Sequence, residues 1–292
     1  MSHGAVPKIT QTGGNRPKQQ TWKVYLRKPA VVIFLTLLVI MVLVSFIGPN
    51  FVGSPFSTAH APLQAPGGAN PLGTDHLGRD YLARVVYGGR TSLLVGFTVA
   101  LLCMTVGLLV GGLAGFYGGV VDTLLVKVAE FFQVIPGLLL ALVAAALLGS
   151  NVTIIIGILA VTMWPVVARI ARAEAMRIAE LGYVESARAA GFSRFRIFWS
   201  DAVPNAMPPV LVATTMTVGL AILLESGLAF LGIGDANRPS WGALLNLAQP
   251  YITSAWWLAA IPGLCIFIVV LAVNMLGDAL NDVLNPNIGK VK

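Results

Sequence analysis

Six long apolar segments divide this chain of 292 residues. A helix that crosses the hydrocarbon core of a bilayer needs roughly 17–25 predominantly apolar residues, and each segment reaches that length. The predicted spans cover residues 30–47, 91–117, 131–148, 152–168, 209–231 and 256–276. Backbone groups in lipid must be satisfied within the segment itself, which favours helices. The sequence therefore predicts an all-α integral membrane protein with six transmembrane helices.

The composition excludes a soluble globular protein. Hydrophobic residues make up 57% of the chain and charged residues only 11%, whereas soluble domains carry about 25% charged residues. The formal charge of +7 does not indicate nucleic-acid binding, because the basic residues flank apolar segments, where they orient membrane proteins. Cys103 and Cys265 lie in apolar runs and are interpreted as packing residues. The three histidines are scattered, so no metal site is predicted.

The distribution of Lys and Arg predicts which side of the membrane each loop faces. Six basic residues and no acidic residue precede the first span in a polar tail, residues 1–29, so the N-terminus is placed in the cytoplasm. Fifteen Lys and Arg then fall in predicted cytoplasmic regions and four in outer regions. Six spans return the tail of residues 278–292 to the cytoplasm. No A-x-A-like cleavage site follows the first span, which is therefore expected to remain as an N-terminal anchor.

Two segments outside the spans carry structural expectations. The outer loop, residues 48–90, is predicted to end in a short helix over residues 78–90 that lies in the membrane interface, with an Asp80–Arg84 pair on its surface. Residues 1–21 are rich in Gly, Pro, Gln and Lys and are expected to be disordered.

A polar segment, residues 169–206, separates the fourth and fifth spans. Most connections are about 2–8 residues long, so a loop of this length is expected to have its own function. A helix is predicted over residues 178–190, ended by Gly191 in a left-handed conformation. Pro204 and Pro208 are predicted to stop a second helix that reaches about Ser200.

The second predicted helix is unusually apolar for a loop. It carries Phe195, Ile197, Phe198 and Trp199. One interpretation is a helix that lies on the membrane surface. The preferred interpretation is a helix that docks a soluble partner.

The spacing within the polar segment resembles a known motif. Glu185-Ser186-Ala187 is followed after three residues by Gly191, and after nine more by Asp201-Ala202-Val203-Pro204. This pattern resembles the EAA loop of ABC-importer permeases, E-A-A-x3-G-x9-I-x-L-P, with Ser186, Asp201 and Val203 as replacements. In that family the loop inserts into a groove on a cytoplasmic ATPase. The resemblance implies that the ATPase-coupling residues are Glu185, Ser186, Ala187, Gly191, Phe195, Val203 and Pro204.

Further stretches resemble the dipeptide, oligopeptide and nickel permeases of that class. They include Pro-Leu-Gly-Thr-Asp at residues 71–75, residues 225–232 with Pro239-Ser240-Trp241-Gly242, Trp256-Trp257, and residues 274–278. The resemblance covers about residues 70–286 and is strongest to the C-type subunit, the second of two permeases in such systems. Peptides are the substrate that the resemblance implies, with nickel chelates and glutathione as alternatives.

The resemblance also implies an architecture and partners. The fold is that of a type I ABC-importer permease, with the anchor at residues 30–47 and a five-helix core over residues 91–277. The partners are a second related permease in a heterodimer, two cytoplasmic ATPase domains that bind ATP and Mg, and an extracytoplasmic solute-binding protein. The location is the bacterial inner membrane. The sequence has no G-x-x-x-x-G-K-[ST] phosphate loop, so this chain is not expected to be an enzyme or to hold a cofactor itself.

Four glycines recur at intervals of four residues along the second span. They are Gly107, Gly111, Gly115 and Gly119. Small residues at this spacing let helix backbones approach closely. The preferred prediction is packing within the chain, and the alternative is packing against a partner permease.

Glu225 lies within an apolar span, where a carboxylate near the helix centre costs roughly 2.5–3.5 kcal/mol. It is either a water-facing gate or pathway residue, or a structural residue hydrogen-bonded to residues 239–242. The first interpretation predicts that Glu225→Gln changes transport without loss of assembly.

A secondary transporter would need coupling-ion sites and usually an internal repeat, and no convincing repeat is evident. A membrane scaffold would leave the polar segment unexplained.

Overall fold

The computed structural model describes residues 28–284, so the predicted disorder of residues 1–21 lies outside the described part of the chain. Within that part, five helices are long and apolar enough to cross a membrane. A bent pair, α4 and α5, gives a sixth if it counts as one span. The helices in order are α2 (Pro29–Ile47), α3 (Tyr81–Tyr117), α4 (Gly119–Val134), α5 (Gly137–Leu148), α6 (Val152–Ala179), α7 (Gly182–Ala189), α8 (Arg194–Ile197), α9 (Val203–Phe230), α10 (Trp241–Ala248) and α11 (Trp257–Leu284).

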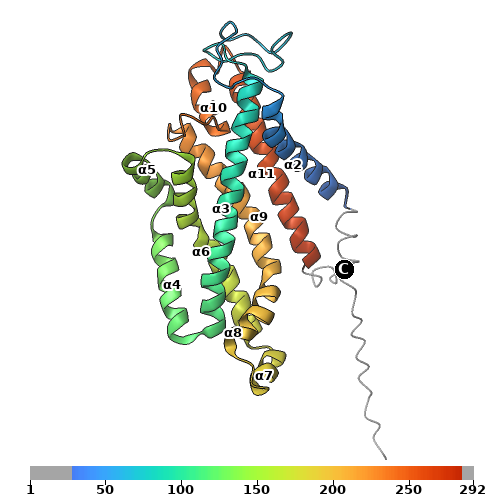
Figure 1. Ribbon diagram of the computed structural model, residues 1–292, viewed down its shortest axis with the longest axis vertical. Helices are drawn as coiled ribbons and strands as arrows, with labels where there is room; N and C mark the ends of the chain where they lie inside the picture. The colour runs from blue at the N-terminus through green and yellow to red at the C-terminus, as the bar shows by residue number, and fades with distance from the viewer. Residues whose placement is uncertain (1–27, 285–292) are drawn as a thin grey trace, which may run out of the picture.

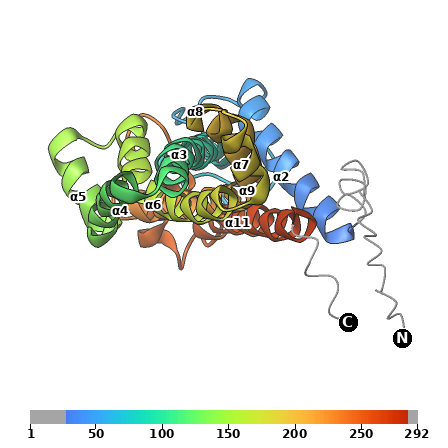
Figure 2. The same ribbon diagram turned by 90° about the horizontal axis from the view of Figure 1, so that it is seen from below.

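The long helices form one bundle around α3 (Figure 1). Helix α3 packs most extensively against α6 and also contacts α9, while α11 packs against α9 and α2. Helices α7 and α8 project from the end of the bundle opposite α10 and the α2–α3 loop (Figure 1). Seen from that end, α4 and α5 lie on one flank and α2 on the other (Figure 2). An ion pair of 2.8 Å between Lys28 and Asp282 joins the start of α2 to the last turns of α11.

The third predicted span is broken. The span was predicted over residues 131–148, but α4 begins at Gly119 and ends at Val134, and α5 follows at an angle of 76°. Pro136 causes the break, because a proline removes an N–H donor and keeps the preceding residue out of the helical region. Ile135 accordingly has φ −79° and ψ 121°.

The start of α3 corrects the predicted interfacial helix. Residues from Tyr81 onward belong to the same continuous helix as the second span, and Tyr81, Val85 and Val86 are buried in the protein. The predicted Asp80–Arg84 ion pair is also wrong. Asp80 instead caps α3, with its carboxylate accepting the Leu82 N–H at 3.0 Å. Arg84 pairs with Asp75 of the preceding loop.

Helices α6 and α9 both extend beyond their predicted spans into the polar segment. Helix α6 continues to Ala179, eleven residues past the predicted boundary at residue 168. Pro204 and Pro208 do not stop a helix as predicted. Pro204 lies in the first turn of α9, directly after a π-helical turn, and Pro208 lies inside α9. The polar segment therefore begins as an extension of α6 and ends as the start of α9, with α7 and α8 between them.

Three of the four repeated glycines bring α3 against α6. A Cβ at Gly107 would lie 2.8 Å from the Val167 side chain. At Gly111 and Gly115 it would meet the backbone carbonyls of Ala168 and Arg172 at less than the 3.0 Å that real Cβ atoms keep. Packing within the chain is therefore confirmed for these three. Gly119 lies beyond the end of α3 with φ +58° and no atom within 4 Å, so its place in the repeat was wrong.

Candidate functional site

The polar segment folds as two short helices joined by a left-handed glycine. Helix α7 (Gly182–Ala189) ends in a hydrogen-bonded reversal, in which the Phe192 N–H donates to Ala187 O at 3.1 Å and the Gly191 N–H to Arg188 O at 3.0 Å. This is the Schellman pattern, which places its central residue in the left-handed region. Gly191 has φ +86°, which confirms its predicted left-handed conformation. Glycine takes this conformation without the strain that a Cβ adds.

The return from Gly191 to α9 is a continuous helical path that the sequence did not predict. The Ser193 hydroxyl caps α8 (Arg194–Ile197) by accepting the Arg196 N–H at 3.3 Å. A single π-helical turn, Phe198–Ala202, then leads directly into α9. A π turn adds one residue to the local hydrogen-bonded ring and shifts the side chains that follow around the helix axis. Residues 194–230 therefore form one unbroken rod.

Buried side chains fix this loop to the ends of α3 and α6. Val184 of α7, with Ile197 and Phe198, is at most 1% exposed, and these residues pack with Phe116 and Ile178. The Phe116 and Phe198 rings have centroids 5.6 Å apart. Burial of a large apolar side chain contributes about 1.5–3 kcal/mol, so the loop is held firmly. Movement of α3, α6 or α9 must carry the loop with it.

A different set of side chains is left exposed on the same loop. Phe195 is 67% exposed and Trp199 45%, with their ring centroids 6.3 Å apart. Phe192 is 44% exposed, and the Arg196 guanidinium stacks 4.6 Å from its ring centroid. Exposed aromatic groups beside arginine are the residue types that dominate binding hot spots. The arrangement provides an exposed surface that combines aromatic and basic side chains on a firmly held loop.

The predicted coupling residues come together in this loop but differ in what they offer. Glu185 is exposed on α7, and Gly191 forms the reversal. The Ser186 hydroxyl donates to Gly182 O at 2.9 Å, so its hydrogen bond is made within α7. Val203 and Pro204 lie in the first turn of α9. Sequence reasoning missed the division between Phe195, which is exposed, and Phe198, which is buried against Phe116 at the end of α3.

Glu225 is sealed inside the subunit. It is 2% exposed, and its carboxylate accepts the Ser92 hydroxyl of α3 at 3.0 Å. The same Ser92 oxygen accepts the backbone N–H of Trp241 at 3.2 Å. The network thus joins α3, α9 and the start of α10, and its geometry favours the structural interpretation over a water-facing gate.

We expect Glu225→Gln to assemble normally and keep its thermal stability, since the amide oxygen still accepts from Ser92. Glu225→Leu leaves the buried hydroxyl without an acceptor, which costs about 1–3 kcal/mol, and should lower the melting temperature of the detergent-purified subunit. Melting curves with matched uptake assays check both variants. Normal stability of Glu225→Gln with strongly altered uptake would support the gate interpretation instead.

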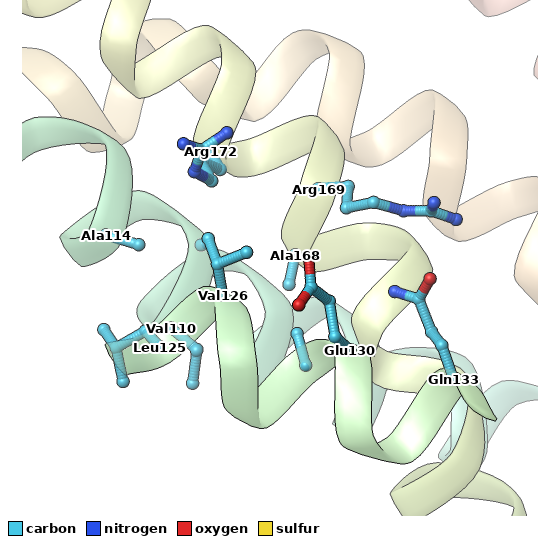
Figure 3. Close-up of a pocket in the computed structure, with 11 residues that line it drawn as sticks. Val110, Ala114, Leu125, Val126, Glu130, Gln133, Ala168, Arg169 and Arg172 are labelled. Atoms are coloured by element: carbon cyan, nitrogen blue, oxygen red, sulfur yellow. The ribbon is translucent and has the colours of Figure 1, made fainter. Parts of the chain in front are cut away.

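A cavity of about 290 Å³ opens between α3, α4 and α6. Figure 3 shows Glu130 and Gln133 extending from α4 toward α6, which carries Arg169 and Arg172. Beside it, Arg172 forms a two-pronged ion pair with Asp122 at 2.5 and 2.6 Å, which ties the start of α4 to α6. Among the described residues, no group of three or more His, Cys, Asp or Glu is placed to hold a metal ion.

These features define a class of protein. A bundle of membrane-spanning helices with a rigid, exposed loop at one end is typical of a membrane subunit that works with other subunits. The profile of the family described as binding-protein-dependent transport system inner membrane component matches residues 107–290, and the chain belongs to this family.

Individual relatives agree with this assignment. The chain is 38% identical over 278 residues to a putative peptide transport system permease protein of Brucella suis, with 94% of each chain covered. It is 35% identical to the dipeptide transport system permease protein DppC of Haemophilus influenzae, covering 93% of this chain and 95% of the relative. It is 32% identical to the glutathione transport system permease protein GsiD of Pectobacterium atrosepticum, covering 97% and 95%.

A solved structure shares the fold. A chain of the inward-facing MetNI methionine ABC transporter superposes with a TM-score of 0.59 at 20% identity, covering 70% of this chain and 98% of that chain. The predicted ABC-importer permease fold and the resemblance to peptide permeases are therefore confirmed. The chain is a multi-pass permease subunit of a family whose importers work with ATPase and substrate-binding partners.

Proposed function

We propose that this chain is one of two related permeases in an ATP-driven importer of short peptides in the bacterial inner membrane. Both termini lie in the cytoplasm, and two cytoplasmic ATPase domains and an outer solute-binding protein complete the complex. The names of the relatives from Brucella suis and Haemophilus influenzae support the peptide substrate. Glutathione, itself a small peptide, is a second candidate that the relative from Pectobacterium atrosepticum supports.

One observation carries the coupling role of the loop. The same short segment is anchored by fully buried side chains on one side and presents exposed Phe195 and Trp199 on the other. From that segment α9 runs for 28 residues, from Val203 to Phe230. At a rise of about 1.5 Å per residue, this single helix reaches about 40 Å. Closure of the ATPases against the loop would thus be transmitted by rigid helices across the membrane domain.

Alternating access follows from this geometry. ATP binding closes the ATPase pair, the loops of the two permeases move with it, and the bundle opens outward to receive solute from the binding protein. Hydrolysis returns the bundle to the inward-open state. The two states need differential contacts with the ATPases, and the exposed aromatic surface of the loop supplies them.

We expect Phe195→Ala and Trp199→Ala each to reduce ATP-driven uptake about tenfold or more, because the loss of an aromatic hot spot costs about 2 kcal/mol or more. Both side chains are exposed, so the fold should survive. Uptake by the reconstituted complex and co-purification of the ATPases are the measurements.

The matched control is Phe51→Ala. Phe51 is 83% exposed, but it follows the C-terminal end of α2 and is not part of the loop. Uptake and the amount of ATPase that co-purifies should therefore stay normal. Unchanged ATPase recovery and uptake in both loop variants would contradict the docking role. That result would favour the alternative in which this apolar surface rests on the membrane.

A further inference from the structure

The four arginines of the predicted outer regions fall into two pairs with different surroundings. Arg79 and Arg84 both bind the carboxylate of Asp75, Arg79 at 2.6 Å. Burial alone would raise the pKa of Asp75, but the Arg79 N–H and the guanidinium groups of Arg84 and Arg79 outweigh it and hold that pKa below its usual value. Asp75 therefore stays ionised and compensates this first pair.

Arg90 and Arg238 form the second pair. Within residues 28–284, neither guanidinium has a carboxylate within 4 Å. Both side chains are exposed, and both line one cavity of about 470 Å³. Two uncompensated positive charges thus converge on a single concave site.

One face of α3 builds a wall of this cavity. Tyr87, Arg90, Thr91 and Leu94 line it, at the i, i+3, i+4 and i+7 spacing that places side chains on one side of a helix. Phe56 of the outer loop adds an aromatic side chain. The cavity therefore combines cationic groups with apolar and aromatic surface, and its volume lies in the range typical of small-molecule sites.

The acidic residue beside Arg238 does not neutralise it. The two carboxylate oxygens of Asp235 accept backbone N–H groups, one from Asn237 at 2.9 Å and one from Val152 at 3.3 Å. The Arg238 N–H donates to the Asp235 carbonyl at 3.2 Å. Asp235 thus shapes the turn and ties it to the start of α6, which leaves the Arg238 guanidinium available to a ligand.

We propose that this cavity binds the carboxylate of a small amphiphilic solute on the outer side of the subunit. Given the proposed function, on which this assignment rests, the ligand is the C-terminal carboxylate of a short peptide, with an apolar side chain against Phe56, Tyr87 and Leu94. Guanidinium groups hold carboxylates through paired, charge-assisted hydrogen bonds. A concave apolar cavity suits a small solute better than the flat acidic surface of a docking protein.

The cavity is also connected to the buried network. Pro239 and Thr91 line it, and each is close in sequence to a member of the Ser92–Trp241 hydrogen bond. Ser92 in turn donates to Glu225 of α9, the helix that begins at the coupling loop. A ligand in the cavity would therefore lie near the outer end of α9, the helix that the ATPases are proposed to move.

The test compares a dipeptide with its C-terminal amide, using the complete importer in nanodiscs and proteoliposomes. The variants are Arg90→Gln and Arg238→Gln. Lys127→Gln, which removes one exposed charge from α4, is the control. We expect each arginine variant to raise the KM for dialanine about tenfold with little change in maximal rate, and to leave the KM for dialanine amide unchanged. Lys127→Gln should behave as wild type.

Two other outcomes of the uptake assay overturn the assignment. Equal losses for acid and amide, together with weaker binding of the empty solute-binding protein, would make the arginines a protein-docking surface. Unchanged kinetics would remove any role for them. If the wild-type complex imports neither compound, the proposed peptide substrate is rejected. Equilibrium binding of labelled dialanine to the complex in nanodiscs then tests the cavity as a binding site, independently of transport. Binding lost in both arginine variants but kept in Lys127→Gln supports the site, and binding that all three retain rejects it.

Discussion

Replacement of Gly191 by proline is expected to uncouple ATP hydrolysis from uptake while the subunit still inserts and assembles. Gly191 has φ +86°, whereas proline fixes φ near −65°. Proline also removes the N–H that donates to Arg188 O. The angle between α7 and α8 would change, and the exposed rings of the loop would no longer meet their partner. We expect uptake to fall about a hundredfold while ATP hydrolysis by the complex persists, measured together in proteoliposomes.

Two further glycine variants make this prediction specific. Gly182 opens α7 without a left-handed φ, and a Cβ added there would meet no atom within 4 Å, so Gly182→Ala should import normally. Gly191→Ala keeps the N–H but incurs the left-handed penalty of roughly 1–2 kcal/mol, and should retain partial uptake. Full uptake by Gly191→Pro would show that the angle between the two helices does not transmit the movement.

The apolar spans and the glycine reversal were predictable because each rests on a local property of the chain. Span length depends on hydropathy alone, and a glycine between two helical stretches marks a left-handed end. The spacing from Glu185 to Pro204 marked out a segment with its own structure, and that segment folds as α7 and α8 between α6 and α9. What the pattern could not give was the boundary of each helix. Charged residues after position 168 are good helix formers, so α6 continues to Ala179 outside the apolar run.

The missed features depend on contacts that a helical spacing rule does not describe. The i,i+4 rule paired Asp80 with Arg84, but Asp80 is the cap of α3 and Asp75 reaches Arg84 from the preceding loop. The burial of Phe198 depends on Phe116, 82 positions earlier in the chain, whereas Phe195 of the same short stretch stays exposed. The convergence of Arg90 with Arg238 joins residues that are 148 positions apart, and no local pattern predicts it.

The largest effect on folding is expected from Gly111→Leu. A Cβ at this position would overlap the backbone carbonyl of Ala168 on α6, and a backbone atom cannot turn away as a side chain can. Overpacking of a well-packed interior costs typically 1–3 kcal/mol and occasionally more, so about 3 kcal/mol or more is expected here. Size-exclusion profiles and melting curves of the detergent-solubilised subunit, expressed alone, provide the measurement. Gly157→Ala is the control, since a Cβ at that helical glycine would meet no atom within 4 Å.

The same variant separates the two interpretations of the glycine repeat. If α3 meets α6 of its own chain through Gly107, Gly111 and Gly115, the lone subunit carrying Gly111→Leu must lose its monodisperse peak. If the glycines instead faced a partner permease, the lone subunit would remain folded and only co-assembly would fail. Gly119→Leu should destabilise the subunit much less than Gly111→Leu. Gly119 lies outside α3 with no atom near its Cβ position, so the only cost is the strain of a left-handed φ. Equal damage from both variants would contradict the α3–α6 contact as the basis of the repeat.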